Sequence, residues 1–175
     1  ATASDNVDGD ITSLIIITNL VNTNSLGSYT VSYNVADSNG NAATQVTRTV
    51  VVEDTTAPVI SLNGSTTTNL SVGQSYNEPG ATATDNYDLN LNPAIIISNG
   101  SVDTMTPGTY FVTYNVSDGA GNAATEVTRT VIVSDAGAPT ITLLGSSPID
   151  VEVKTTYSDA GATAFDTVDG NLTSL

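Results

Sequence analysis

Residues 108–139 read "GTYFVTYNVSDGAGNAATEVTRTVIVSDAGAP", which is two alternating stretches joined by a loop with two glycines. Apolar and polar residues alternate through 109–116 and again through 125–133, as expected of strands that bury one face. The loop between them, "SDGAGNAA", has the small and polar residues typical of a hairpin connection. This stretch therefore predicts a β-hairpin of two long strands.

The same hairpin occurs earlier in the chain, since 27–58 read "GSYTVSYNVADSNGNAATQVTRTVVVEDTTAP". The rest of the unit repeats as well. "APVISLNGSTTTNLSVGQSYNEPGATATDN" at 57–86 lies over "APTITLLGSSPIDVEVKTTYSDAGATAFDT" at 138–167. Such self-similarity over about 81 residues indicates tandem domains. It predicts the later part of one domain at 1–56, a complete domain at 57–137 and the beginning of a third at 138–175.

Within the complete unit, seven short strands are predicted, at 59–63, 68–72, 80–84, 94–98, 101–104, 109–116 and 125–133. Turn residues separate these segments and none shows helical periodicity, which favours an all-β, two-sheet sandwich of the immunoglobulin-like type. The run "AIIIS" at 94–98 is continuously apolar, so we expect this strand to be buried on both faces or near the sheet centre. Tyr110 and Tyr114 are expected to be core and corner tyrosines.

The composition excludes several classes of function. Eighteen acidic residues stand against three basic ones, for a net charge of −15, so nucleic acid and anionic lipid are not expected partners. Cysteine and histidine are absent, which removes disulfides, thiolate metal sites, thiol nucleophiles and imidazole bases. No apolar run reaches the roughly 20 residues of a membrane helix. We therefore expect neither an enzyme nor membrane insertion by this segment.

Several motifs of this chain resemble those of the bacterial immunoglobulin-like repeat of cell-surface and secreted proteins. They are "TAP" before the first strand, "PGATATDN" at 79–86, and the "GTY", "Y.V.D" and "GN.A" elements of 108–123. The likeness covers essentially the whole chain and extends, more distantly, to hyalin and cadherin-type repeats. It implies an extracellular or cell-surface array of tandem immunoglobulin-like domains that serves as a stalk or spacer, whose partners are neighbouring domains of the same chain.

Acidic residues concentrate in three places of the repeat. Twelve of the eighteen lie in the loop after the third strand, in the hairpin loop or in the interdomain linker. In an immunoglobulin-like sandwich the first two loops lie at the end where the chain enters the domain. Like charges gathered there repel one another unless a cation neutralises them, and Ca²⁺ accepts six to eight oxygen ligands in flexible geometry. The sequence thus predicts calcium (Ca2+) at the domain junctions.

The candidate ligands recur in each copy of the repeat. They are Glu53, Asp54, Asp85, Asn86, Asp88 and Asp118 at the junction before the complete domain; Asp5, Asn6, Asp8, Asp10 and Asp37 in the first copy; and Asp135, Asp166 and Asp169 in the third. A competing interpretation is that these residues only form turns, because Asp, Asn and Gly favour turns on their own. The second copy departs from the others at Leu89, where Gly9 and Gly170 stand, which bears on its loop conformation.

Two functional classes remain after these exclusions. One is a structural spacer stiffened by calcium. The other is an adhesive binding module for a glycan, ice or a protein, or a subunit of a self-assembling extracellular fibre built from like chains. Near-identity between copies favours the spacer, since a recognition domain usually differs from its neighbours. An exposed aromatic cluster on one copy would favour the binding module.

Overall fold

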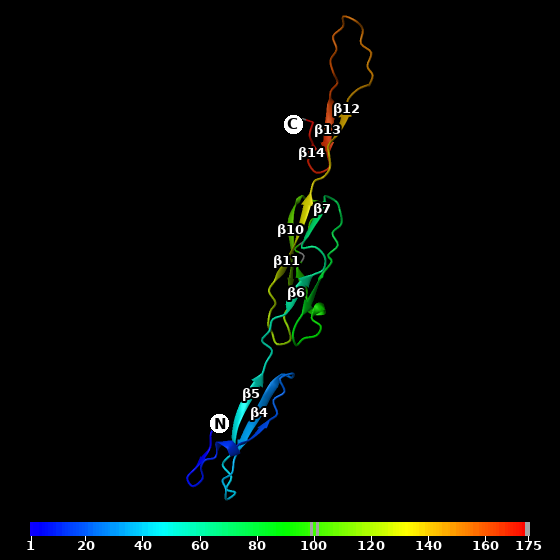
Figure 1. Cartoon of the computed structure of the whole chain (residues 1–175). Helices are drawn as coiled ribbons and strands as arrows, with labels where there is room; N and C mark the ends of the chain where they lie inside the picture. Colours follow the sequence, from blue (N-terminus) through cyan, green and yellow to red (C-terminus); the bar gives the residue numbers. More distant parts are fainter. Residues whose placement is uncertain (99, 101, 174–175) are drawn as a thin grey trace. The chain divides into compact units, whose positions relative to one another are not determined.

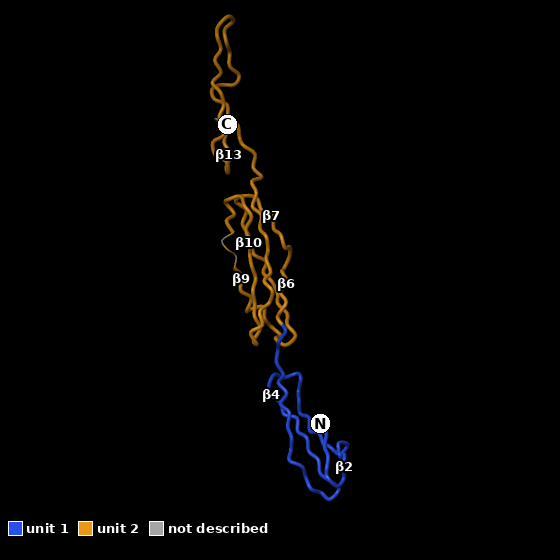
Figure 2. The backbone as a smooth tube through the Cα atoms, turned by 90° about the vertical axis from the view of Figure 1, so that its left-hand side faces the viewer, with its two compact units in different colours: residues 1–56 blue, residues 57–175 orange. Residues whose placement is uncertain are grey.

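The long hairpin predicted from the sequence forms in both compact units of the computed structural model, which describes residues 1–98, 100 and 102–173. Unit 1 comprises residues 1–56 and unit 2 residues 57–175, coloured separately in Figure 2. In unit 2, β10 (Gly108–Asn115) pairs antiparallel with β11 (Val127–Ser134). In unit 1, β4 (Gly27–Asn34) pairs in the same way with β5 (Val46–Val52). The repeat in sequence is therefore also a repeat in strand register.

Two sheets face each other in the first part of unit 2 (Figure 1). One has the strand order β7-β11-β10-β9 and the other pairs β6 with β8. The strands not yet placed are β6 (Val59–Leu62), β7 (Thr67–Ser71), β8 (Ala81–Thr84) and β9 (Ile96–Ser98). β7 runs parallel to β11, whereas the other neighbours are antiparallel.

The hydrophobic core lies between these two sheets. Val112, Tyr114 and Val131 of the larger sheet are fully buried, and they cluster with Ile60 and Ala83 of the smaller one. Alternating residues of each strand supply this core, as the period-two pattern predicted. The prediction of an all-β, immunoglobulin-like β-sandwich is confirmed.

Unit 1 and the last part of unit 2 contain portions of the same arrangement. Unit 1 has the hairpin β1 (Ser4–Asp5) and β2 (Gly9–Asp10), and a sheet in which β3 (Ile16–Asn19) precedes β4 and β5. The later segment forms a sheet of β12 (Thr140–Leu143), β13 (Ala162–Asp166) and β14 (Gly170–Asn171). Two 3-10 turns, η1 (Thr12–Leu14) and η2 (Asn92–Ala94), follow the first and second Asp loops. The units divide after Thr56, whereas the predicted boundary at 137 lies inside unit 2 and stays a prediction.

Two strand predictions were wrong. Of the segment 101–104, residues 102–104 are not extended strand, and residue 101 lies outside the described residues. The run 94–98 forms only the short strand β9, at the edge of its sheet rather than at the centre. Ile96 is 68% exposed and Ile97 is 40% exposed. A continuous apolar run was a poor guide here because only Ile95, just before the strand, packs against the core.

A core tyrosine and a corner tyrosine are both present, in the order opposite to that in which the two roles were predicted. Tyr114 is a core residue with no exposed surface. The Tyr110 hydroxyl donates a hydrogen bond to the Thr106 carbonyl four residues earlier, at 2.8 Å. Tyr29 makes the equivalent bond to Ser25 at 2.8 Å in unit 1. This corner contact ties the start of the long hairpin to the preceding turn.

Candidate metal centre

The first aspartate of each Asp loop folds its own loop into a turn. Oδ1 of Asp5, Asp85 and Asp166 accepts hydrogen bonds from the backbone N–H groups two and three residues further on, at 2.7 to 3.1 Å. These backbone donors lower the pKa of Asp5 and of Asp166. These aspartates therefore do form turns, as the competing interpretation held. The turn uses only Oδ1 and leaves the other carboxylate oxygen, Oδ2, available to bind a cation.

The next aspartate of the loop reaches the hairpin loop of the same domain. Asp88 Oδ2 accepts the backbone N–H of Gly119 at 2.7 Å. In unit 1, Asp8 accepts both the backbone N–H of Ser38 at 2.8 Å and its hydroxyl at 2.9 Å. Two loops that are about 30 residues apart in sequence are thus fastened together in both copies.

The hairpin aspartate is held by an asparagine four residues later, which the sequence analysis did not single out. Asn122 donates its backbone and side-chain N–H groups to Asp118, both at 2.7 Å. Asn41 does the same for Asp37 at 2.7 and 2.6 Å. Burial acts to raise the pKa of Asp118, but the bonds from Asn122, together with backbone N–H groups of the same loop, outweigh it and the pKa is lowered. The side-chain bond from Asn41 is the main reason that the pKa of Asp37 is lowered.

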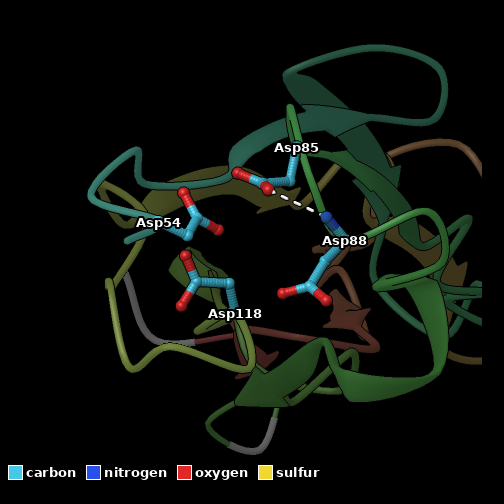
Figure 3. A group of neighbouring side chains, drawn as sticks. All are labelled: Asp54, Asp85, Asp88 and Asp118. Carbon is cyan, nitrogen blue, oxygen red and sulfur yellow. Dashed lines mark hydrogen bonds between the residues drawn. The ribbon is translucent and has the colours of Figure 1, made fainter. Parts of the chain in front are cut away.

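These contacts gather three carboxylates in each copy of the repeat. Unit 1 brings together Asp5, Asp8 and Asp37; unit 2 brings together Asp85, Asp88 and Asp118, and also Asp135, Asp166 and Asp169, with one oxygen of each within 4.8 Å of the others in its group. Figure 3 shows the carboxyl groups of Asp85, Asp88 and Asp118 around a common space. Asp54, the fourth residue labelled there, belongs to unit 1.

The group in the third copy includes a residue from the linker. Asp135 follows β11 directly, and its Oδ1 accepts the backbone N–H of Gly137 at 2.9 Å. Asp166 and Asp169 come from the next Asp loop, and Asp166 is only 4% exposed. In the sequence, Asp54 is the equivalent of Asp135 one repeat earlier. The joining of Glu53 and Asp54 to the loops of the following domain stays a prediction.

Three carboxylates at such separations form a site of concentrated negative charge. Their oxygen atoms are the donor type that Ca²⁺ prefers, and the ion tolerates irregular geometry. Among the described residues, the buried Oδ2 of Asp85 has no hydrogen-bond partner. A buried carboxylate oxygen without a donor is costly in free energy, whereas a bound cation would satisfy it. The residues present therefore fit a calcium ion.

Three further predicted ligands, Asp10, Asn6 and Asn86, are not members of these carboxylate groups. Asp10 is not a member of the unit 1 group; its Oδ1 instead accepts the backbone N–H of Thr12 at 2.9 Å. Hydrogen bonds from Thr12 lower the pKa of Asp10. Asn6 and Asn86 directly follow the turn-forming Asp5 and Asp85 in the sequence, and their part in the groups stays a prediction.

A buried polar network in unit 2 was also missed by the sequence analysis. Arg129 of β11 has no exposed surface, and its guanidinium donates to the carbonyls of Asn63 at 2.8 Å, Gly80 at 3.2 Å and Ser65. Its Nε lies 3.0 Å from the Tyr114 hydroxyl and 3.4 Å from Glu78 Oε1. The signal in the sequence was an arginine at the same alternating position of both hairpins, in strands otherwise almost free of charge.

Glu78 is the anionic member of this network. It accepts hydrogen bonds from the hydroxyls of Tyr76 and Tyr114 and, at 2.8 Å, from the backbone N–H of Gly80. Burial acts to raise the pKa of Glu78, but the bonds from Tyr114, Tyr76 and Gly80, together with Arg129, bring it below its usual value. Burial and the neighbouring Glu78 raise the pKa of Tyr76 and of Tyr114. The network is structural, because it joins two loops, one before and one after β7, to the central hairpin.

The chain is similar to several proteins of known sequence. It is 33% identical over 180 residues to an uncharacterized 81.3 kDa protein of Acholeplasma phage L2, covering 98% of this chain and 24% of that protein. It is 29% identical to the pesticidal crystal protein Cry22Aa of Bacillus thuringiensis, covering 79% of this chain and 19% of that one. Hyalin of Strongylocentrotus purpuratus is 34% identical over 75% of this chain and 11% of its own length. The chain thus spans about a quarter or less of these relatives.

A solved lipoprotein structure from Bacteroides thetaiotaomicron is 33% identical, covering 46% of this chain and 39% of that one at a TM-score of 0.41. Among the described residues, no helix has the length and apolar character needed to cross a membrane. The family model described as "Bacterial surface protein, Ig-like domain" matches residues 1–52 and 60–133. With the sandwich described above, this match shows that the chain belongs to the family of bacterial surface immunoglobulin-like domains.

Proposed function

We propose that this chain is a non-enzymatic spacer segment of an extracellular surface protein, stiffened by calcium bound at its domain junctions. The observation that carries the proposal is the recurrence of one three-carboxylate group in every copy of the repeat. A turn needs only its first aspartate, whereas all three copies bring further carboxylates beside it. Family membership and the likeness to hyalin support an extracellular location.

The linker is the part of the site that would make the ion structural. In the third copy, Asp135 reaches the Asp loop that follows it, so an ion held there would bind a linker and the next domain together. By repeat equivalence, Asp54 and Glu53 would serve the same purpose before the complete domain. Calcium would offset the mutual repulsion of these carboxylates and restrict bending at the linker.

Calorimetry of the 175-residue protein with calcium and with a chelator tests the binding. A ligand that binds only the folded form stabilises it by about 2.7 kcal/mol at a concentration 100-fold above Kd. We expect calcium to raise the melting temperature of the protein. Asp118→Asn should remove much of this rise for the complete domain, whereas Asp150→Asn, an exposed acidic position outside the groups, should leave it intact.

Small-angle scattering under the same conditions tests the stiffening. Calcium should increase the maximum dimension of the protein, and Asp135→Asn should reduce that increase. Unchanged melting temperature and unchanged dimension at millimolar calcium would show that the Asp loops are ordinary turns. A rise in melting temperature without a change in dimension would leave calcium as a stabiliser of single domains and would contradict the spacer mechanism.

A further inference from the structure

The hairpin loops of the two units differ at one position that bears on their chemistry. The loop of unit 1 reads "DSNGN" at 37–41, and the loop of unit 2 reads "DGAGN" at 118–122. Asn39 is therefore followed by Gly40, whereas Ala120 stands at the place of Asn39 in the second loop. Both Asn39 and Ala120 are exposed, so this position faces solvent in the complete domain as well as in unit 1.

An asparagine that precedes a glycine can modify itself without an enzyme. The backbone nitrogen of the glycine loses its proton and attacks Cγ of the asparagine side chain, which expels the side-chain nitrogen as ammonia and closes a cyclic succinimide. Water then opens the ring at either carbonyl. The product is aspartate, or isoaspartate, in which the main chain runs through the former side-chain carbon. Glycine favours the reaction because it has no Cβ to obstruct the attack.

The surroundings of Asn39 permit this attack. A Cβ added at Gly40 would meet nothing within 4 Å, so the space beside the attacking residue is open. In the described part of the chain, Asn39 is held through its backbone N–H, which donates to Asp37 Oδ1 at 2.9 Å, and its side chain is exposed. The Gly40 N–H donates to the Asp37 carbonyl at 3.1 Å. This bond lies within one short surface loop, so a local fluctuation is enough to open it.

A second asparagine–glycine pair, Asn63 and Gly64, is held much more firmly. The Asn63 side-chain amide donates to the Pro79 carbonyl at 3.1 Å, and its backbone N–H donates to the Gly80 carbonyl at 3.0 Å. The Asn63 carbonyl accepts the guanidinium of the buried Arg129 at 2.8 Å. Attack on Asn63 therefore requires that the buried network opens, which is a larger and rarer fluctuation.

The reaction at Asn39 would change the hold on the hairpin aspartate. Asp37 Oδ1 accepts the backbone N–H of Asn39 at 2.9 Å and that of Asn41 at 2.7 Å, and the Asn41 side chain donates to Oδ2 at 2.6 Å. Isoaspartate at position 39 lengthens the main chain between these two donors, so Asn41 loses the spacing with which it holds Asp37. A new carboxylate also appears two residues from Asp37, where like charges repel.

We propose that Asn39 is a self-modification site, which Gly40 converts with time to isoaspartate or aspartate. The step consumes one water and releases one ammonia, and it needs neither an enzyme nor a cofactor. The hairpin loop of unit 1 thereby loosens with age, whereas the loop of unit 2, with Ala120, does not. Because the attacking nitrogen must lose its proton, the rate rises with pH. No metal ion takes part, so the proposal is independent of calcium.

Incubation of the 175-residue protein at mildly alkaline pH with a chelator, followed by peptide mapping with mass spectrometry, tests the reaction. We expect the mass gain of an amide-to-acid conversion at position 39. It should be about tenfold or more faster than at Asn63, because each hydrogen bond that must break slows the attack several-fold. Asn41 lies in the same loop but precedes Ala42, so it is an internal control and should stay an amide. Mapping assigns any gain at the pair 99–100 separately.

Matched variants move the reaction from one loop to the other. Asn39→Ala gives the unit 1 loop the residue of unit 2 and should abolish the mass gain there. Ala120→Asn should create the same gain in the loop of unit 2. An Asn39 that stays unmodified, under conditions that convert a synthetic peptide of residues 35–43, would overturn the proposal. Equal rates at Asn39 and Asn63 would overturn it as well.

Hydrogen exchange measures the loosening of the loop. The backbone N–H of Asn41 should exchange faster in the aged protein than in fresh Asn39→Asp, which carries the new charge without the longer main chain. Equal exchange of Asn41 in these two samples would contradict the loosening. Since the chelator is present throughout, none of these outcomes bears on the calcium proposal.

Discussion

The hairpins β4–β5 and β10–β11 have nearly the same sequence but very different surroundings. Arg129 is fully buried among three carbonyls, a tyrosine and a glutamate, whereas Arg48, at the same place in the repeat, is exposed. Val131 has no exposed surface and Val50 is half-buried. The hairpin therefore sets strand register by itself, but its inward residues become a core only when the first half of the repeat covers them. Matched substitutions in the two hairpins measure that difference.

The largest effect is expected at the buried arginine. Arg129→Ala leaves Glu78 in the interior without its cation and should cost about 3–5 kcal/mol, the usual result of removing one partner of a buried ion pair. Arg48→Ala in the same protein should cost less than about 0.5 kcal/mol, because surface substitutions rarely do more. Chemical denaturation, with hydrogen exchange to separate the two hairpins, measures both. Equal losses of stability in the two variants would contradict the conclusion that the first half of the repeat turns the inward face of the hairpin into a core.

The apolar equivalents should differ in the same direction by a smaller amount. Val131→Ala removes two methyl groups from the closed core and should destabilise unit 2 by about 2–3 kcal/mol. Val50→Ala should cost clearly less, because part of its surface already contacts water. The same denaturation curves, with an unchanged m-value as the control for two-state unfolding, give both numbers.

The Asp loops offer a third comparison. Gly9 and Gly170 adopt positive φ of 72° and 77° and begin the short strands β2 and β14. Leu89 stands at this place in the second copy, is 98% exposed and is followed by no such strand, yet the Asp85 turn is retained. Gly9→Leu should cost about 1–2 kcal/mol locally, since no atom obstructs its Cβ and only the backbone conformation is strained.

Leu89→Gly is the reciprocal change and should alter the stability of unit 2 by less than about 0.5 kcal/mol, as an exposed position allows. Hydrogen exchange of the residues around the two loops reports both variants. A large loss of stability in Leu89→Gly would mean that this leucine has a contact beyond the loop, and the comparison would then fail.

The smallest effect concerns pH. The pKa of Glu78 is lowered from its usual 4.5 in the folded protein, so its stabilising contribution is complete above that value. It is lost as the pH falls through the lowered pKa, because protonation then costs the folded state more than the unfolded state. Glu78→Gln should therefore flatten the acid side of the stability profile of unit 2. The exposed Glu152→Gln is the control, and a profile unchanged in Glu78→Gln would contradict the assignment.

The sequence predicted those features that depend on local pattern. Strand alternation predicted the two hairpins, the repeat predicted the equivalence of the three copies, and a core and a corner role were both predicted for the pair Tyr110 and Tyr114. The apolar run at 94–98 was misread because an edge strand and a central strand differ in their neighbours, which alternation does not encode. Arg129 was missed for a similar reason. The carbonyl groups that accept hydrogen bonds from Arg129 lie 49 to 66 residues away in the sequence, so no local pattern predicts that this cation is buried.

For the candidate metal centre, the sequence predicted the residue types and the loops that carry them, but not the contacts between those loops. The gathering of Asp85, Asp88 and Asp118 depends on a backbone contact between two distant loops, which the spacing in sequence does not contain. Asn41 and Asn122 were overlooked, although each lies four residues after the hairpin aspartate that it holds. Asp10 was included because of its type, and its position in β2 separates it from the group.

The parallel pairing of β7 with β11 has a mechanical consequence. These are strands near the beginning and the end of the complete sandwich, and they are joined directly, over residue pairs from Thr67–Thr130 to Ser71–Ser134. A pull on the two ends of this domain reaches β11 directly and β7 once β6 has been released from β8, and it then acts along β7 and β11 in opposite directions. Such a load shears the hydrogen bonds of the pair together, rather than opening them one after another from a free end. The resistance of this domain to tension therefore depends on the shear strength of one parallel strand pair.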